Sequence, residues 1–455
     1  MLEARTLRAF AMPLGFHSRP SAFCQLVLPR LSHTRSTPPP VYIDGVENTE
    51  KYHAGGYLPV KIGDVFGDER YKVVHKLGSG GFSTVWLARD RADISGRLVS
   101  LKIMSAEESV VTGARELAIS NELDKVSKTT SHPSSATCRV YRDHFMHHTH
   151  HGSHLCLVSE FAGPSLNTIS MWGRGPSRPP RRLRADVARS VAKQVSWAVH
   201  FMHQAGIVHG DLTPSNLLFK VAEGAQRWTD DEVYATLGPP TIHEIDTPQG
   251  LIEVVEVVEP SYMAISSILR EDVFLSDFGM SFIAARKPAD YEGGTQFMYM
   301  APESFFDKNF SFASDVWALA CLICYIRSAS PPFDGYIDHP DTTLREMVRT
   351  LGRLPDPWWD AWTEREIWFD DDGELLPQHT LDPKATLREI VHRIGRRDRP
   401  RDELDIDMVE KRGVSLPEEE VELLTDLLEK MLKYRSEERI TMEEVVQHPW
   451  FQYGQ

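Results

Sequence analysis

One stretch of the chain, residues 207–218, reads Ile207-Val208-His209-Gly210-Asp211-Leu212-Thr213-Pro214-Ser215-Asn216-Leu217-Leu218. An aspartate placed in such a turn can accept the proton of a substrate hydroxyl, which is the task we assign to Asp211. Asn216, five positions later, offers a side-chain oxygen that can hold a metal ion. These two groups are working parts of phosphoryl transfer, and the stretch predicts that chemistry.

Two further motifs follow in the order that this chemistry needs. Residues 275–279 (LSDFG) place a second metal-binding acid, Asp277, on a strand-to-loop turn. Residues 300–303 (MAPE) then end the segment that separates this turn from the later helices. Each motif alone can occur by chance, whereas their fixed order along one chain is specific.

Upstream, residues 77–85 (LGSGGFSTV) join two predicted strands through a cluster of glycines. Because glycine has no Cβ atom, backbone N–H groups there can approach phosphate oxygens closely. Taken alone, the pattern fits a tight hairpin turn equally well. As a phosphate-binding turn it would supply the nucleotide contacts Leu77, Gly78, Ser79, Gly80, Gly81, Phe82, Ser83 and Val85.

A lysine follows the glycine turn on the next predicted strand. Residues 99–102 (VSLK) end on Lys102, whose ammonium can bind the α- and β-phosphates if an acid on the following helix holds it. Glu116 is the candidate acid. A salt-bridged surface lysine is the alternative, and only the order behind the glycine turn favours the catalytic interpretation. We therefore predict Asp211, Lys102 and Glu116 as the catalytic residues.

In this order the motifs resemble those of the eukaryotic protein kinase superfamily over residues 71–451. The resemblance extends to residues 314–317 (SDVW), to Arg439 as the partner of Glu303, and to residues 448–451 (HPWF). Residues 52–64 (YHAGGYLPVKIGD) are similar to the leader of the SR-protein kinases, which phosphorylate serines in arginine/serine-rich splicing factors. That leader, with an insertion before LSDFG, favours this subfamily.

The resemblance implies an α+β, protein kinase-like fold with a small β-rich N-lobe and a larger, mainly helical C-lobe. Residue patterns agree, because residues 71–102 alternate as strands do and the second half of the chain repeats at helical spacing. The resemblance places ATP between the lobes, with Mg²⁺ held by Asn216 and Asp277. Glu160 and Ala162 would contact the nucleotide at the hinge, beside a small gatekeeper, Ser159.

The chain divides into four predicted parts. Residues 1–50 form a leader that we expect to be disordered, and residues 51–70 form the SR-kinase-like segment. The N-lobe spans residues 71–161. The C-lobe spans residues 162–451, with a surface insertion at about 219–272 that is too irregular for one core element.

Two departures from the family pattern bear on activity. Gly210 stands where most kinases have an arginine that pairs with a phosphorylated activation loop, so we expect activity without that phosphorylation. Thr213 stands where a lysine is usual, which predicts slow turnover. Both departures leave open a pseudokinase that acts as an interaction scaffold. A small-molecule kinase is a further alternative, which the MAPE segment disfavours.

Composition narrows the partners and the location. The net charge of −15 disfavours direct nucleic-acid binding and suits a cationic protein substrate. The acidic residues 370–374 would guide such a substrate by charge, and a merely solvated loop is the alternative interpretation of them. Five cysteines in 455 residues indicate a reducing compartment. No apolar run is long enough for a membrane span. We expect a monomer.

The first 40 residues contain five arginines, no lysine and one acid, with apolar residues at helical spacing. Such a segment is typical of a mitochondrial transit peptide, and a merely disordered leader is the alternative. We expect an intracellular protein of the nucleus and cytoplasm, or of mitochondria if the leader is a transit peptide.

Overall fold

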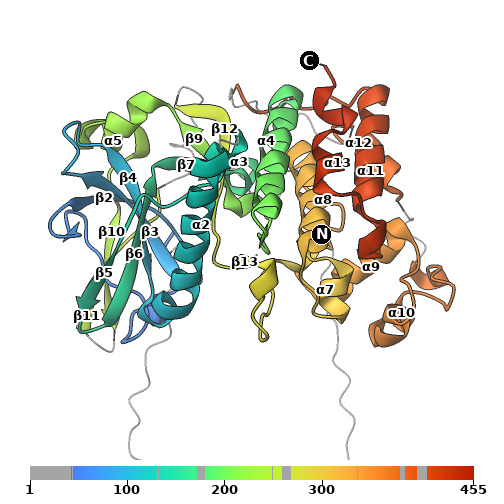
Figure 1. The fold of residues 1–455 in the computed structure, drawn as a ribbon, viewed down its shortest axis with the longest axis horizontal. Coiled ribbons are helices and arrows are strands. Elements are labelled where there is room, and N and C mark those ends of the chain that lie inside the picture. Colours follow the sequence, from blue (N-terminus) through green and yellow to red (C-terminus); the bar gives the residue numbers. More distant parts are fainter. Residues whose placement is uncertain are drawn as a thin grey trace, which may run out of the picture. The chain divides into compact units, whose positions relative to one another are not determined.

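The computed structural model describes residues 43, 45–130, 133–171, 180–247, 250–258, 268–335, 337–379, 385–396 and 407–454. The arginine-rich segment that carries the transit-peptide hypothesis lies outside the described residues. Within them, strands gather at one end of the molecule and helices at the other (Figure 1). This α+β architecture, a small β-rich lobe and a larger, mainly helical lobe, is the predicted one.

The small lobe is built on one antiparallel sheet with the strand order β1-β2-β3-β4-β6-β5. Successive side chains of a strand point to opposite faces, so Val99, Leu101 and Ile103 pack into one buried cluster, while Ser100 and Lys102 face the interlobe cleft. The strands are β1 (Val65–Phe66), β2 (Tyr71–Ser79), β3 (Ser83–Asp90), β4 (Leu98–Met104), β5 (Asp143–Thr149) and β6 (Gly152–Glu160).

One long helix, α2 (Ala114–Thr130), belongs to the small lobe and begins after the short α1 (Ala106–Glu108) and a π-helical turn, η2 (Ser109–Gly113). The buried side of α2 includes Glu116, Ile119 and Leu123. An acid among these apolar residues needs a partner, because burying an unpaired charge is costly.

The large lobe is centred on α8 (Phe312–Ser328), in which every residue from Ser314 to Arg327 is buried. A helix that is apolar on all sides belongs in a core, and α4 (Ala185–Gln204) packs against it. The remaining helices are α3 (Leu166–Met171), α7 (Pro302–Phe306), α9 (Pro340–Leu351), α10 (Trp358–Ala361), α11 (Leu387–His392), α12 (Glu418–Met431) and α13 (Met442–Val446). None of the helices in the described residues is both long and apolar enough to cross a bilayer.

Two small sheets carry the motifs. One has the order β12-β9-β7 and consists of β7 (Ala162–Ser165), β9 (Leu217–Val221) and β12 (Leu269–Leu275); the other pairs β8 (Ile207–Val208) with β13 (Phe282–Ile283). The turn with Asp211 and Asn216 therefore lies between β8 and β9, and Asp277 lies just after β12. Since β12 and β9 are hydrogen-bonded neighbours, these polar residues emerge beside one another.

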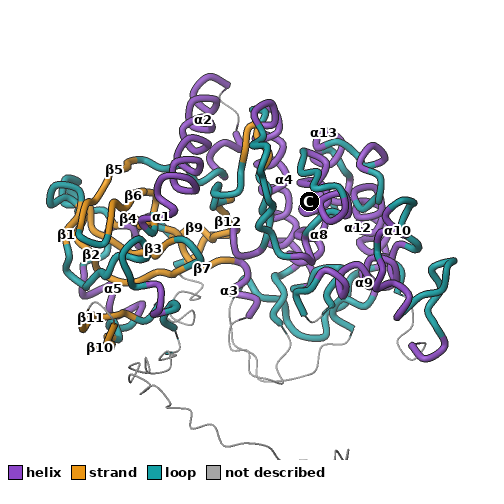
Figure 2. The backbone as a smooth tube through the Cα atoms, turned by 90° about the horizontal axis from the view of Figure 1, so that it is seen from below, coloured by secondary structure: helices purple, strands orange, loops and turns teal. Residues whose placement is uncertain are grey.

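The residues predicted as an insertion are more ordered than their sequence suggests. Between β9 and β12 they form α5 (Asp230–Leu237) and a hairpin of β10 (Ile242–Thr247) and β11 (Gly250–Val255), which lies beside the small-lobe strands in Figure 2. Val254 of this hairpin packs with Tyr52 and Tyr57. Both tyrosines belong to the segment of residues 45–70, which is called the leader from here on. The leader and the insertion thus form one apolar cluster on the small lobe.

Polar contacts fix this cluster to the sheet. Glu47 of the leader and Lys76 of β2 form an ion pair in which both side chains are almost fully buried. Asp230 at the start of α5 pairs with Arg89 at 2.6 Å and with Lys72 at 3.1 Å. A fully buried ion pair such as Glu47–Lys76 fixes how the two segments are aligned more than it adds to the free energy of unfolding.

A second buried ion pair fixes the end of the activation segment to the large lobe. Both guanidinium nitrogens Nη1 and Nη2 of Arg439 donate to the Glu303 carboxylate at 2.6 Å. Arg439 also donates to the carbonyls of Lys433 and Ala313, each at 2.8 Å. This is the pairing that the sequence predicts between the MAPE segment and Arg439.

Arg439→Met should strongly destabilise the protein, because it leaves the Glu303 carboxylate buried without its partner. We expect the free energy of unfolding to fall by about 3–5 kcal/mol, the usual cost of breaking a buried pair from one side. Denaturant unfolding measures the change. Arg270→Met is the matched control, since Arg270 pairs with Asp272 at the surface and its loss should change little. Equal losses in the two variants would contradict the assignment.

Candidate active site

A cleft of about 430 Å³ lies between the small-lobe strands β2 to β4 and the turns of the large lobe. Predicted site residues that line it are Leu77, Gly78, Ser79, Gly80, Ser83, Val85, Lys102, Ala162, Asn216 and Asp277. The other predicted residues do not line it: Gly81 and Phe82 lie at the outer tip of the turn, Glu116 lies behind Lys102, and Asp211 lies beside Asn216. Glu160 does not line it either, because its side chain bonds to Gln226 and Arg142. Phe82 is 48% exposed, so its side chain points to solvent rather than to the cleft.

A charged triad joins β4, α2 and the turn after β12. Lys102 Nζ lies 2.8 Å from both carboxylate oxygens of Glu116 and 3.3 Å from Asp277 Oδ1. Burial alone would lower the pKa of Lys102, but Asp277 and Glu116 raise it well above its usual value. The same ammonium holds the pKa of Asp277 below its usual range. Lys102 is therefore a fixed cation that points into the cleft.

The turn between β8 and β9 holds the predicted base. Asn216 Nδ2 donates to both the carbonyl and the Oδ2 of Asp211 at 2.8 Å, which fixes the carboxylate relative to the amide. Burial raises the pKa of Asp211 above its usual value. Behind the turn, Asp315 accepts from the backbone N–H groups of His209 at 2.7 Å and Gly210 at 3.0 Å. The turn is thus held on the N-terminal part of the core helix α8.

Asp277 adopts the left-handed conformation, with φ of 65°. A non-glycine residue with positive φ is uncommon, and such strain concentrates at functional sites. Its side chain is half exposed, toward the cleft, while the next residue, Phe278, is fully buried and packs on His209 with ring centroids 5.9 Å apart. Burying the phenyl ring turns the adjacent carboxylate toward the nucleotide side.

The donor set fits Mg²⁺. Asn216 uses Nδ2 for its contacts with Asp211, which leaves Oδ1 for a cation, and Asp277 adds carboxylate oxygens; hard oxygen ligands of this kind suit Mg²⁺, which usually takes its other ligands from phosphate and water. No group of three or more His, Cys, Asp or Glu side chains within the described ranges could hold a metal on its own. That includes the histidines of the β5–β6 hairpin, His147, His148, His150 and His151.

Gly210 lies where the Cβ atom of any other residue would force its neighbours to move. Its φ is +77°, and a Cβ atom would lie 2.5 Å from the hydroxyl of Tyr291 and 2.8 Å from the carbonyl of Met280. Tyr291 donates to that same carbonyl at 2.8 Å and packs with Phe282 and Phe310 in a buried aromatic cluster. Apolar packing thus fixes the segment that follows Asp277 against the turn that carries Gly210.

The leader contacts the glycine turn, which sequence reasoning missed. Lys51 Nζ donates to the carbonyl of Gly81 at 2.7 Å, and the Tyr57 hydroxyl donates to the carbonyl of Gly80 at 2.5 Å. The backbone N–H of Ser105 donates to the carbonyl of Phe82 at 2.8 Å. The turn is therefore held from outside by three of its backbone carbonyls, and within the turn the Gly80 N–H donates to the carbonyl of Ser83 at 2.9 Å. The motif in residues 52–64 was the one feature of the sequence that could have indicated this contact.

Other lining residues also escaped prediction. Ser100, Arg139 and Tyr141 form the rear of the cleft, and Val257 and Val258 of the insertion line it as well. The backbone N–H of Val258 donates to the carbonyl of Lys76 at 3.0 Å. The predicted insertion therefore takes part in the nucleotide site.

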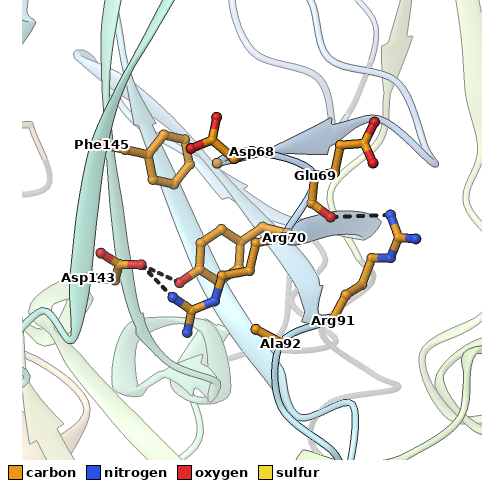
Figure 3. A pocket seen from close by; sticks show the side chains of 9 residues that line it. Asp68, Glu69, Arg70, Arg91, Ala92, Asp143 and Phe145 are labelled. Carbon is orange, nitrogen blue, oxygen red and sulfur yellow. Dashed lines mark hydrogen bonds and ion pairs between the residues drawn. The ribbon is translucent and has the colours of Figure 1, made fainter.

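A larger hollow of about 650 Å³ lies at the outer edge of the small lobe (Figure 3). Two of its charged lining residues pair with each other: Arg70 lies 3.0 Å from Asp143, and it also pairs with Asp90 at 2.8 Å. The Tyr71 hydroxyl also donates to Asp143, at 2.6 Å. This hollow contains no motif residue, and the contacts tie β2 to β3 and β5. The interlobe cleft remains the candidate site.

Comparisons with known proteins show the family of the chain. A family model described as "Protein kinase domain" matches residues 71–242 and 261–451. The chain is 27% identical over 419 residues to the serine/threonine-protein kinase SRPK of Physarum polycephalum, covering 89% of this chain and 91% of the relative. It is 36% identical over 198 residues to protein kinase dsk1 of Schizosaccharomyces pombe, covering 43% and 34%. It is 26% identical over 399 residues to human dual specificity protein kinase CLK1, covering 87% and 68%.

Gly210→Ala should lower both stability and phosphoryl transfer, because its Cβ atom would displace Tyr291 or the backbone at Met280. Gly206→Ala is the matched control: Gly206 has a φ of +75° but open space around its missing Cβ. The control should lose only the cost of left-handed backbone, about 1–2 kcal/mol. Thermal unfolding and a transfer assay compare the two. Equal effects would show that the clash with Tyr291 is unimportant.

Tyr57→Phe should weaken nucleotide binding, because it frees the Gly80 carbonyl and lets the glycine turn move. We expect the Kd for Mg-ATP to rise by roughly 2–12-fold, the worth of one neutral hydrogen bond. Calorimetry or a fluorescent nucleotide measures it. Tyr234→Phe is the control, since Tyr234 donates to the carbonyl of Val74, away from the turn. An unchanged Kd in Tyr57→Phe would show that the leader does not position the turn.

Proposed function

We propose that this chain, which belongs to the protein kinase family, phosphorylates serines within arginine/serine-rich segments of other proteins. The activity itself is that of a serine/threonine protein kinase, since the family's domain covers most of the chain and SRPK-type kinases are among its relatives. The substrate class is the step that we add. It rests on the leader in residues 52–64 and on likeness to SRPK-type relatives along most of the chain.

The chain's own groups supply position and charge for the transfer. Lys102, fixed by Glu116, binds the α- and β-phosphates, and the N–H groups of the glycine turn face phosphate oxygens. Asp211 orients the serine hydroxyl and accepts its proton as the oxygen forms a bond to the γ-phosphorus and the bond to the β-phosphate oxygen breaks. Mg²⁺, held by Asn216 and Asp277, neutralises phosphate charge when bound.

An acidic loop supports a cationic substrate. Asp370, Asp371, Asp372 and Glu374 are exposed in a tight turn closed by a bridge between Phe369 and Leu375. Asp370 Oδ1 accepts from the N–H groups of Asp372 and Glu374, which leaves the other carboxylates toward solvent. Together with a net charge of −15, exposed acids attract arginine-rich chains over long range.

We also propose that the kinase is active without phosphorylation of its activation segment. The aromatic packing around Tyr291 supplies the restraint that a phosphate and an arginine supply elsewhere. Thr295 influences the pKa of the catalytic Asp211, so a phosphate there would place negative charge beside a carboxylate. Full activity of unphosphorylated protein and of Thr295→Ala supports the proposal, and a requirement for phosphate at Thr295 refutes it.

The location and oligomeric state are proposals of the same kind. We propose a monomer that works in the nucleus and cytoplasm. Imaging of a C-terminal fluorescent fusion tests the location, and a mitochondrial signal would favour the transit-peptide alternative for residues 1–40. Light scattering of the purified protein tests the monomer.

The decisive experiment compares transfer of labelled γ-phosphate from Mg-ATP to an arginine/serine-repeat peptide and to a generic basic serine peptide. We expect the repeat to have the higher kcat/KM, and Asp277→Ala to abolish transfer to both because a phosphate-bridging metal loses its acid. Replacing Asp371 and Asp372 by asparagine should raise KM for the repeat and reduce its dependence on salt, with kcat unchanged. Equal use of both peptides would refute the substrate class.

A further inference from the structure

The rear wall of the nucleotide cleft carries hydrogen-bond donors that the protein does not use, and we propose that it is a subsite for a purine with an oxygen at C6. Guanine nucleotides would then bind at least as well as adenine nucleotides. The inference rests on the proposed function only in taking this cleft as the phosphoryl-donor site. It concerns three groups, Arg139, Ser100 and the carbonyl of Glu160.

Arg139 enters the cleft from the connection between the turn η3 (Pro133–Thr137) and β5. Its backbone N–H donates to the carbonyl of Leu275 at 2.9 Å, which places the residue at the back of the site. Its Nη2 donates to the carbonyl of Glu160 at 2.7 Å. Within the part of the chain that the structure describes, its buried Nε has no hydrogen-bond partner. One donor of the guanidinium is thus left for a ligand.

Ser100 is the second unused group. It lies on β4 directly opposite Ser159 of β6, it lines the cleft, and it is 1% exposed. Its hydroxyl oxygen is buried and unpartnered among the described residues. Buried polar groups in native proteins nearly always have partners, so two such groups in one cleft indicate a ligand with matching polar atoms.

Among the residues that the structure describes, no carboxylate forms an ion pair with the guanidinium, and the Glu160 and Glu116 charges act on it only from farther away. The Glu160 side chain is committed elsewhere: its Oε1 accepts from Gln226 at 2.9 Å, and its Oε2 pairs with Arg142 on the outside of the sheet. Arg139 therefore meets only the backbone carbonyl of Glu160, and burial lowers its pKa. A buried cation without an ion-pair partner costs free energy. An acceptor atom on the ligand would reduce that cost.

The chemistry of the base then decides the preference. A guanidinium can only donate. Adenine presents an amino group at C6, which would set donor against donor and would compete with Arg139 for the Glu160 carbonyl. Guanine and hypoxanthine present a carbonyl oxygen at C6, which can accept from Arg139. Sites that leave a buried donor unpaired reject that ligand strongly.

The test measures the binding of ATP, GTP and ITP to the full-length protein by displacement of a fluorescent nucleotide. We expect GTP and ITP to bind the wild type at least as tightly as ATP. In Arg139→Val the ratio of the GTP to the ATP dissociation constant should rise by at least about tenfold, the loss of one hydrogen bond to a charged group. ITP has the oxygen at C6 but lacks the 2-amino group of guanine, so its binding tests the effect of the oxygen alone.

Arg142→Val is the matched control, because it removes an arginine that also touches Glu160 but lies outside the cleft; its nucleotide ratio should stay that of the wild type. A tenfold preference of the wild type for ATP, or an unchanged ratio in Arg139→Val, would overturn the inference. If Arg139→Val does not fold, the wild-type comparison of ATP with ITP decides alone. Guanine binding without transfer to any peptide would refute only the proposed function, and transfer from ATP with no GTP binding would refute only this inference.

Discussion

The site depends on the charged triad of Lys102, Glu116 and Asp277, which joins three separate elements. Lys102 comes from β4, Glu116 from α2 and Asp277 from the turn after β12. Lys102 Nζ lies 2.8 Å from Glu116 Oε1 and 3.3 Å from Asp277 Oδ1. Glu116 is fully buried, and a carboxylate at that depth is tolerable only with its cation in place. The energetic demand of one acid therefore fixes the helix and the two lobes in the arrangement that phosphoryl transfer needs.

Much of the site could be predicted because each motif is a contiguous run whose chemistry shows in its residue types. The glycine turn, Lys102, Asp211, Asn216 and Asp277 all fall in such runs. In the structure most of the turn, Lys102, Asn216 and Asp277 line one cleft, and Asp211 lies beside Asn216. The two-lobed fold class came from the resemblance to protein kinases, and strand alternation and helical spacing agreed with it, because those periods follow directly from backbone geometry.

The rest could not be predicted, because it depends on contacts between segments distant in sequence. Nothing around Arg139 marks it as a lining residue, and only the fold brings its guanidinium beside Glu160. Residues 219–272 look irregular because acidic residues and the run Gly238-Pro239-Pro240 interrupt their apolar residues, yet Val254 and Val255 find buried partners on the leader and the sheet. The role of Tyr291 likewise shows only once the space around Gly210 is known. Such pairings carry no local period or motif.

The contact between leader and insertion also has a consequence for the chain as it is synthesised. Val257 donates its N–H to the carbonyl of Gly45, and the Val255 carbonyl accepts from the Lys76 ammonium. The small lobe therefore needs residues that the ribosome adds at widely separated times. At the usual 5–20 residues per second, the stretch from Gly45 to Val258 takes roughly 10–40 s to translate. During that interval the exposed apolar side chains of the leader and β2 have no cover. The nascent small lobe is then a natural client for chaperones, although the finished domain is not.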